Sequence, residues 1–225
     1  MCEKVNRMLS KYRTVYIGNE AEIVEKKSRF IATVKPVKSE EEAIEFIESL
    51  KKKYWNATHN CSAYVIGERF QTQRCSDDGE PSGTAGKPML DVLLGEEIHD
   101  VAGVVTRYFG GTLLGTGGLV RAYQGATKAG LEASLVITKM HGQKMRVETD
   151  YTGLGKIQYI LGQKGIRILN SEYTDRVALE VLLPDNELKS VMAEITEGTN
   201  GKAKMELLEE CYFADVEGEM MIFED

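Results

Sequence analysis

Residues 107–123 place five glycines between an apolar strand and a helix, with Arg107 and Arg121 on either side of the turn. Glycine adopts backbone angles that other residues avoid, and it lets other groups approach the main chain closely. A helix that begins directly after such a turn exposes N–H donors that have no partner within the helix. Because these donors suit an anion, the segment predicts a strand–turn–helix unit that binds negative charge.

A second dense segment lies at residues 76–88, where a polar loop runs into an expected helix. One interpretation is that Asp77, Asp78 and Glu80 hold Mg²⁺, which binds one or two carboxylates together with substrate phosphates. Lys87 and the start of the helix would then bind the phosphate. The predicted anion-binding residues of the two segments are Ser82, Gly83, Thr84, Lys87, Arg107, Gly110, Gly111, Gly117, Gly118 and Arg121.

Both segments also have a purely structural interpretation. The glycines would then serve only sharp turns and close packing, and each arginine would form an ion pair with Asp77, Asp78 or Glu80. Asp77 and Asp78 would form an Asx turn, and Thr84 would cap the helix. Neither segment is a P-loop or a GxGxxG motif, so neither standard nucleotide motif is present.

The composition favours a two-domain protein of the cytoplasm. The chain has 225 residues, four scattered cysteines without a CxxC pair and no apolar run near the roughly 20 residues that cross a bilayer. The net charge of -7 is uneven, because the first 139 residues carry 19 basic and 18 acidic side chains. A polyanion would therefore bind the first half, while the acidic second half could engage a protein.

The first half, domain 1–138, has the pattern of an α/β domain. Three strands are expected between Tyr12 and Pro36, and Ser39 with Glu42 forms a capping box before an amphipathic helix. Further strands are expected at 61–66 and 101–108, with a polar loop at 69–81. Helices are expected near 84–95 and after the glycine turn, where Leu119, Tyr123, Ala126 and Ala133 would share a face.

The second half, domain 139–225, shows the element order β-α-β-β-α-β. Strands are expected at 145–149, 166–172, 177–183 and 203–210, and helices at 154–161 and 188–195. This order matches a ferredoxin-like split βαβ domain.

Nucleophile and zinc chemistry find little support in the sequence. His59 and Cys61 would share a strand face, but no third ligand completes a zinc set. Free cysteine is often buried, so a core position is expected for Cys61.

The two segments, with His59-Asn60-Cys61, resemble the signatures of the IMPACT family, bacterial YigZ branch. The resemblance implies an α+β protein with two domains. The first would be a two-layer domain similar to the ribosomal-protein and GHMP-kinase superfamily, and the second would be similar to the last domain of elongation factor G. Eukaryotic members regulate a kinase that responds to uncharged tRNA and carry an RWD domain that we do not find here. Their regulatory partner is therefore not carried over.

We expect a non-enzymatic, cytosolic protein that binds RNA or a ribosomal component in the regulation of translation. The phosphate-binding surface would consist of Lys87, Arg107 and Arg121. The alternative is a Mg²⁺-dependent enzyme that transfers a phosphoryl group or cleaves a phosphate ester on a nucleotide or small phosphorylated molecule. No cofactor other than Mg²⁺ is expected.

Overall fold

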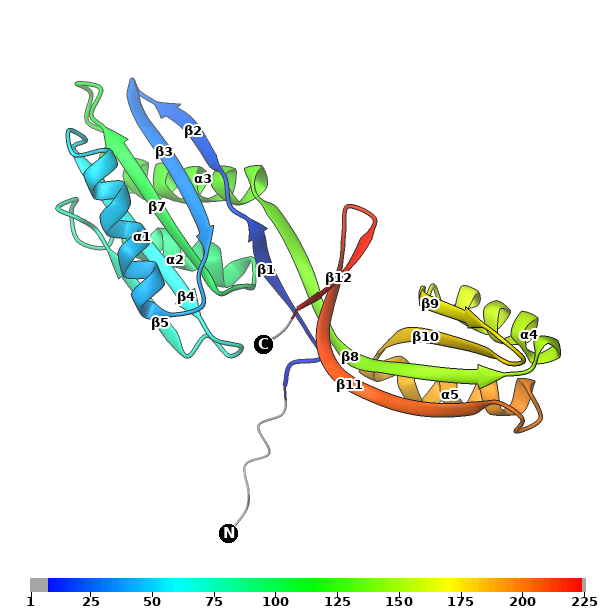
Figure 1. Cartoon of the computed structure of the whole chain (residues 1–225). Coiled ribbons are helices and arrows are strands. Elements are labelled where there is room, and N and C mark those ends of the chain that lie inside the picture. The colour runs from blue at the N-terminus through cyan, green and yellow to red at the C-terminus, as the bar shows by residue number, and fades with distance from the viewer. Residues whose placement is uncertain (1–7, 224–225) are drawn as a thin grey trace, which may run out of the picture. The chain divides into compact units, whose positions relative to one another are not determined.

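The computed structural model describes residues 8–223, which form two compact units (Figure 1). The first unit is Tyr12–Thr138, and the second contains the residues from Lys139 onward. Residues 8–11 group with the second unit, whereas we expected them in domain 1–138. Cys2 lies outside the described residues. None of the described helices is long and apolar enough to span a bilayer.

A five-stranded antiparallel sheet forms the centre of the first unit, in the order β2-β3-β7-β4-β5. The strands are β2 (Glu20–Glu25), β3 (Ser28–Pro36), β7 (Val101–Tyr108), β4 (His59–Ile66) and β5 (Thr72–Ser76). A short parallel pair, β1 (Lys11–Ile17) with β6 (Ile98–His99), lies outside this five-stranded sheet.

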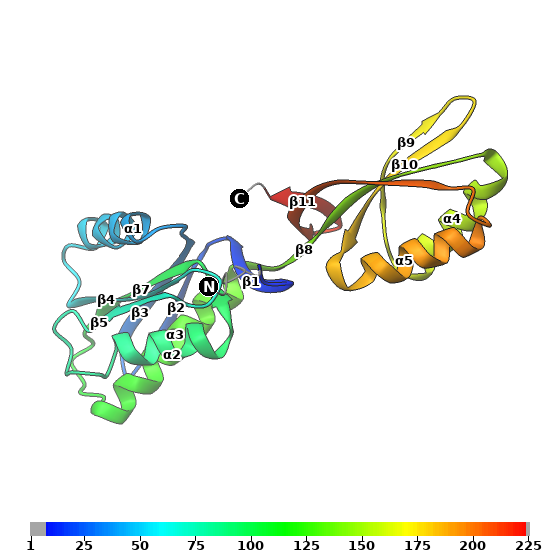
Figure 2. The same cartoon turned by 90° about the horizontal axis from the view of Figure 1, so that it is seen from below.

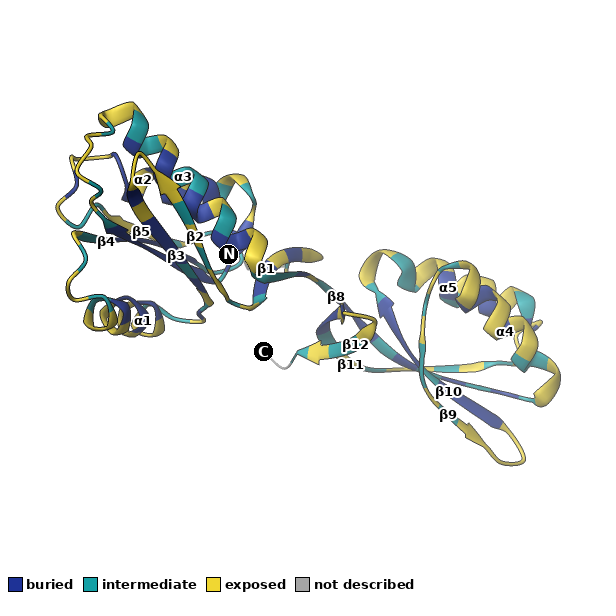
Figure 3. Cartoon of the chain, turned by 90° about the horizontal axis from the view of Figure 1, so that it is seen from above, coloured by how far each residue is buried: buried dark blue, intermediate teal, exposed yellow. Residues whose placement is uncertain are grey.

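Helices cover both faces of this sheet (Figure 2). Helix α1 (Glu40–Lys53) buries Ala43, Phe46, Ile47 and Leu50 on one face, where they join the core. Helices α2 (Gly86–Gly95) and α3 (Thr116–Ala133) cover the opposite face with a larger core. The unit therefore has three layers rather than the two that we expected, and its buried residues follow the strands and the inner faces of the helices (Figure 3).

Local sequence signals account for α1 and α3. Ser39 Oγ accepts from the Glu42 amide at 3.3 Å and caps α1, as expected. On α3, Leu119, Tyr123 and Ala126 are buried, but Ala133 at the end of the helix is exposed. The small residues do allow close packing, because a Cβ atom at Gly130 would lie only 3.0 Å from Ala32 Cβ.

The second unit has the predicted β-α-β-β-α-β order. Its elements are β8 (Leu135–Thr149), α4 (Tyr151–Gln163), β9 (Ile168–Tyr173), β10 (Val177–Pro184), α5 (Asp185–Gly198) and β11 (Lys204–Val216). The strands are antiparallel in the order β9-β10-β8-β11. Both helices contribute to one apolar core, with Ile157 and Ile195 fully buried.

Three strands were not predicted, and one of them is the two-residue β6. Strand β5 lies within the segment expected to be a polar loop, and it is an exposed edge strand without apolar alternation. Strand β12 (Glu219–Phe223) extends the second sheet through a hairpin from β11. The α+β, two-domain fold class itself is confirmed.

The loop after β7 is fixed by a close backbone contact. A Cβ atom at Gly110 would lie 2.0 Å from the Lys27 carbonyl carbon, so the Gly110→Ala variant must displace the loop or the β2–β3 turn. We expect it to lose about 1–3 kcal/mol of unfolding free energy in urea titrations. The control is Gly95→Ala, whose Cβ meets nothing within 4 Å. Equal stability of the two variants would contradict this packing.

Candidate functional site

The two segments singled out in the sequence meet at a cavity of about 440 Å³ beside the end of β7. Its polar lining includes His59, Glu80, Arg107 and Thr116. Its apolar lining consists of Pro81, Phe109, Leu113, Leu114 and Leu119. We call this space the motif cavity.

A buried ion pair joins the two segments beside the motif cavity. Arg107 Nη1 donates to Glu80 Oε1 at 2.6 Å, and the two side chains are only 6% and 3% exposed. The guanidinium of Arg107 also lies over the rings of Phe30 and Phe109, 5.4 and 5.6 Å from their centroids. Glu80 therefore compensates the charge of Arg107, which is the structural alternative considered for this arginine.

Tyr123 and Cys61 extend the buried network. Tyr123 donates its hydroxyl to Glu80 Oε1 at 2.8 Å, and Cys61 Sγ lies 3.3 Å from the same hydroxyl. Burial raises the pKa of the Cys61 thiol and of the Tyr123 hydroxyl well above their ordinary values, so both groups stay protonated. Cys61 is thus a core residue, as expected. Tyr123 was not among the predicted site residues, although a fully buried tyrosine hydroxyl usually has a polar partner.

Asp77 caps helix α2 from a preceding loop. Its carboxylate accepts from the amides of Gly83, Ala85 and Gly86 at 2.7, 3.0 and 2.8 Å. Burial acts to raise the pKa of Asp77, but these three donors outweigh it and hold the pKa below its ordinary value. The amides that we assigned to an external anion at Gly83 are therefore already bound to an internal one.

Two neighbouring hydroxyls do not cap α2. Thr84 Oγ1 donates to the Pro81 carbonyl at 2.6 Å, so Asp77 rather than Thr84 provides the cap. Ser82 is exposed on the loop.

Asp78 has partners of its own. Its Oδ2 accepts from the Asn60 amide at 2.6 Å, and its Oδ1 lies 3.4 Å from Lys51 Nζ. His59 Nδ1 lies 2.8 Å from the Asp78 carbonyl oxygen. Asp77, Asp78 and Glu80 thus face three different sets of groups. Within residues 8–223, no cluster of three or more His, Cys, Asp or Glu side chains could hold a metal ion.

The three predicted phosphate-binding cations do not form one surface. Lys87 Nζ pairs with Asp91 Oδ1 at 2.6 Å on α2. Arg121 lines a separate hollow of about 480 Å³ with Asp91 and Lys128, whereas Arg107 lines the motif cavity. The expected Lys87, Arg107 and Arg121 surface is therefore corrected, because Lys87 and Arg107 are paired internally. Arg121 lines the other hollow, although its Nη1 lies close to Gly117 in the first turn of α3.

The glycines of the second segment have different positions. Gly110 contacts the backbone of Lys27, and Gly111 has a φ of 82° in the loop. Gly117 and Gly118 lie in the first turn of α3, after the N-cap residue Gly115. No side chain caps this helix, and its first turn holds no acidic residue. Among the described residues, the start of α3 thus differs from the start of α2, where Asp77 accepts from the amides.

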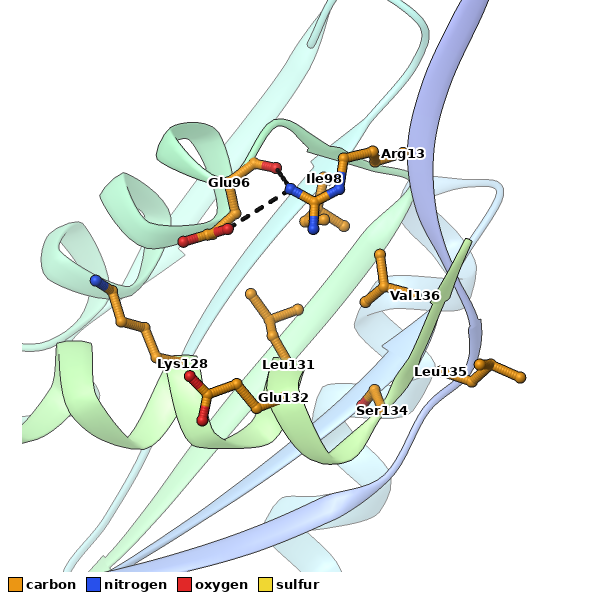
Figure 4. Close-up of a pocket in the computed structure, with 9 residues that line it drawn as sticks. All are labelled: Arg13, Glu96, Ile98, Lys128, Leu131, Glu132, Ser134, Leu135 and Val136. Atoms are coloured by element: carbon orange, nitrogen blue, oxygen red, sulfur yellow. Dashed lines mark hydrogen bonds and ion pairs between the residues drawn. The ribbon is translucent and has the colours of Figure 1, made fainter. Parts of the chain in front are cut away.

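A further hollow of about 410 Å³ lies at the other end of α3 (Figure 4). There Arg13 Nη1 donates to the Glu96 carbonyl at 2.8 Å and lies 3.6 Å from Glu96 Oε2. Lys128, Leu131 and Glu132 of α3 line the opposite side. None of the predicted site residues lines this hollow.

Comparisons with known proteins match both units. Residues 26–131 match the Impact N-terminal domain, and residues 147–202 match a domain of unknown function, DUF1949. IMPACT family member YvyE of Bacillus subtilis is 47% identical over 87% of this chain and 90% of its own length. IMPACT family member YigZ of Escherichia coli is 38% identical over 82% of this chain and 92% of its own length.

One solved structure, described as the crystal structure of an hypothetical protein, is also similar. It has a TM-score of 0.57 and 35% identity over 90% of this chain and 99% of its own. Shorter matches include eukaryotic proteins named IMPACT.

We predict that Glu80→Gln destabilises the first unit, because it leaves Arg107 buried without a counter-charge. Breaking one partner of a buried pair costs about 3–5 kcal/mol, measurable by urea unfolding. The double variant Glu80→Gln/Arg107→Met should lose less unfolding free energy than the two single variants lose together. The exposed Glu132→Gln on α3 serves as the control, and an equal loss there would refute this role of the pair.

The cap on α2 predicts a specific pH dependence. The pKa of Asp77 is lowered in the folded state, so its carboxylate stabilises the fold fully above the unfolded pKa of about 3.9. This stabilisation is lost as the pH falls through the folded pKa. Asp77→Asn should therefore lower the unfolding free energy at pH 7 by about 2 kcal/mol. The difference in unfolding free energy between this variant and the parent should become smaller in acid. The control Asp91→Asn, at an exposed ion pair on the same helix, should change little.

Proposed function

Because the chain belongs to the IMPACT family, we propose that it is a non-enzymatic protein of the cytoplasm that binds RNA, free or within the ribosome, in the regulation of translation. The observation that carries the proposal is a group of exposed cations and large apolar side chains at one end of the first unit's sheet. We call it the cationic rim. It consists of Lys26, Lys27, Lys52, Trp55, Phe109 and Leu113.

Three chain segments build the cationic rim. The β2–β3 turn supplies Lys26 and Lys27, and this turn lies beside the loop that follows β7 (Figure 1). The backbone of Gly110 contacts that of Lys27, which places the turn against the loop carrying Phe109. The Tyr108 hydroxyl donates to Asn56 at 2.9 Å and so attaches the segment after α1, where Trp55 lies.

The side chains of the cationic rim are suited to single-stranded RNA. Trp55 is 81% exposed, Leu113 83% and Phe109 46%. Exposed aromatic rings stack on bases, and nearby lysines neutralise phosphates. Among the described residues, Lys26, Lys27 and Lys52 have no ion pair with a carboxylate. Arg29 is not counted, because Glu22 binds it at 2.8 Å.

The enzyme alternative gains no support from the described residues. Its three proposed Mg²⁺ ligands have separate partners, and Asp77 already accepts three amides. The acidic second unit remains a candidate surface for a protein partner.

The test is fluorescence anisotropy with a labelled single-stranded RNA at about 50 and 200 mM salt, since released counterions make binding salt-dependent. The double variant Lys26→Ala/Lys27→Ala should reduce the slope of log affinity against log salt by about 1 for each lysine. Trp55→Ala should weaken binding by about 1–3 kcal/mol.

The matched control is Lys35→Ala/Lys38→Ala, which removes the same charge at the opposite end of β3. We expect it to keep most of the affinity. No RNA binding at low salt, or equal losses in both double variants, would refute the cationic rim as the binding surface.

A further inference from the structure

The motif cavity adjoins the cationic rim. The groups that line the cavity are therefore close to the surface that we propose binds RNA. Phe109 and Leu113 belong to both, and the cavity volume of about 440 Å³ is in the range of small-molecule sites. The inference below rests on the proposed function, because the rim would bring the RNA there.

One part of the motif cavity is apolar and suits a flat ring. Pro81, Leu114 and Leu119 line it together with Phe109 and Leu113. Leu119 is buried in the main core and Leu114 packs against the same core, so this part of the wall is held by the core. A nucleobase has two apolar faces that contact such side chains without regard to sequence.

Polar groups lie in the same cavity beside this wall. Arg107 is nine-tenths buried, and its Nε has no hydrogen-bond partner. His59 Nδ1 donates to the Asp78 carbonyl, while its Nε2 lies 3.9 Å from Glu80 Oε1, beyond hydrogen-bond distance. Nε is itself shielded from solvent, but Arg107 lines the cavity with one donor that no group of the described residues satisfies.

The start of α3 supplies an anion site at the same cavity. Gly115 and Thr116 line the cavity, and the helix that they begin has 18 residues and no capping side chain. The contrast with α2 is informative, because there a carboxylate of this chain, Asp77, occupies the corresponding amides. At α3 the amides of the first turn face no such internal carboxylate among the described residues.

From this combination we propose that the motif cavity receives one unstacked nucleotide of the bound RNA. The base lies against the apolar wall near Arg107 and His59, and a phosphate lies at the first turn of α3. The site binds without chemistry, and it gives the rim a point at which the RNA strand is held in register.

The test uses Gly117→Asp, which adds a carboxylate to the first turn of α3. Acidic residues stabilise a helix start, so the variant should fold at least as well as the parent while it repels a phosphate. A Cβ at Gly117 would make only an ordinary contact, with Arg121 Nη1 at 3.6 Å, so the side chain fits beside this cation of the same helix. Gly117→Asn is the matched control, because it has the same size without the charge.

The probes are 5′-adenosine monophosphate, adenosine and inorganic phosphate, measured by isothermal titration calorimetry, with the labelled RNA measured in parallel. The mononucleotide should bind the parent more tightly than adenosine or phosphate does. Gly117→Asp should weaken it about tenfold or more, and Gly117→Asn should weaken it clearly less. Lys26→Ala/Lys27→Ala should weaken RNA binding but leave mononucleotide binding nearly unchanged.

The two hypotheses fail differently. If RNA binds in a salt-dependent way but the mononucleotide does not bind, or Gly117→Asp leaves its affinity unchanged, the nucleotide site is refuted and the cationic rim stands. If phosphate alone binds as tightly as the mononucleotide, the cavity does not recognise a base and the inference is also overturned. If neither RNA nor mononucleotide binds, both proposals fail.

Discussion

The buried ion pair between Glu80 and Arg107 is the interaction on which the arrangement of this site depends. It joins a loop before α2 to the end of β7, and Tyr123 of α3 donates to the same carboxylate. Neither charge could stay buried without the other. The pair therefore fixes three elements around one cavity, and it uses a cation and a carboxylate that would otherwise be candidates for ligand chemistry.

The two helices that begin beside this network differ in whether a side chain accepts from their first amides. Helix α2 begins on amides that Asp77 has already satisfied, so that end is closed to outside anions. Helix α3 begins after Gly115 with no capping side chain, so its amides remain available. A helix start becomes an anion site only where the fold leaves its donors unsatisfied, and side chains distant in sequence decide this.

In the proposed function, the cationic rim and the motif cavity would have two different roles. Exposed cations and aromatic rings at the end of the sheet would give sequence-tolerant contact with a nucleic acid backbone and its bases. The cavity offers enclosed space and directed polar groups, as small-ligand sites do. Gly110 makes the arrangement possible, because only a residue without a side chain lets the loop carrying Phe109 approach the turn carrying Lys27.

The sequence by itself determined the elements with strong local signals: the Ser39 cap, the apolar β7, the glycine turn and the β-α-β-β-α-β order. Strand β5 escaped prediction because an exposed edge strand is specified by its pairing with β4 and not by its own side chains. Only the tertiary structure decided that Asp77 would accept from the first amides of α2 and that Glu80 would neutralise Arg107. Local patterns report what a residue can bind, whereas burial and distance decide which partner is already there.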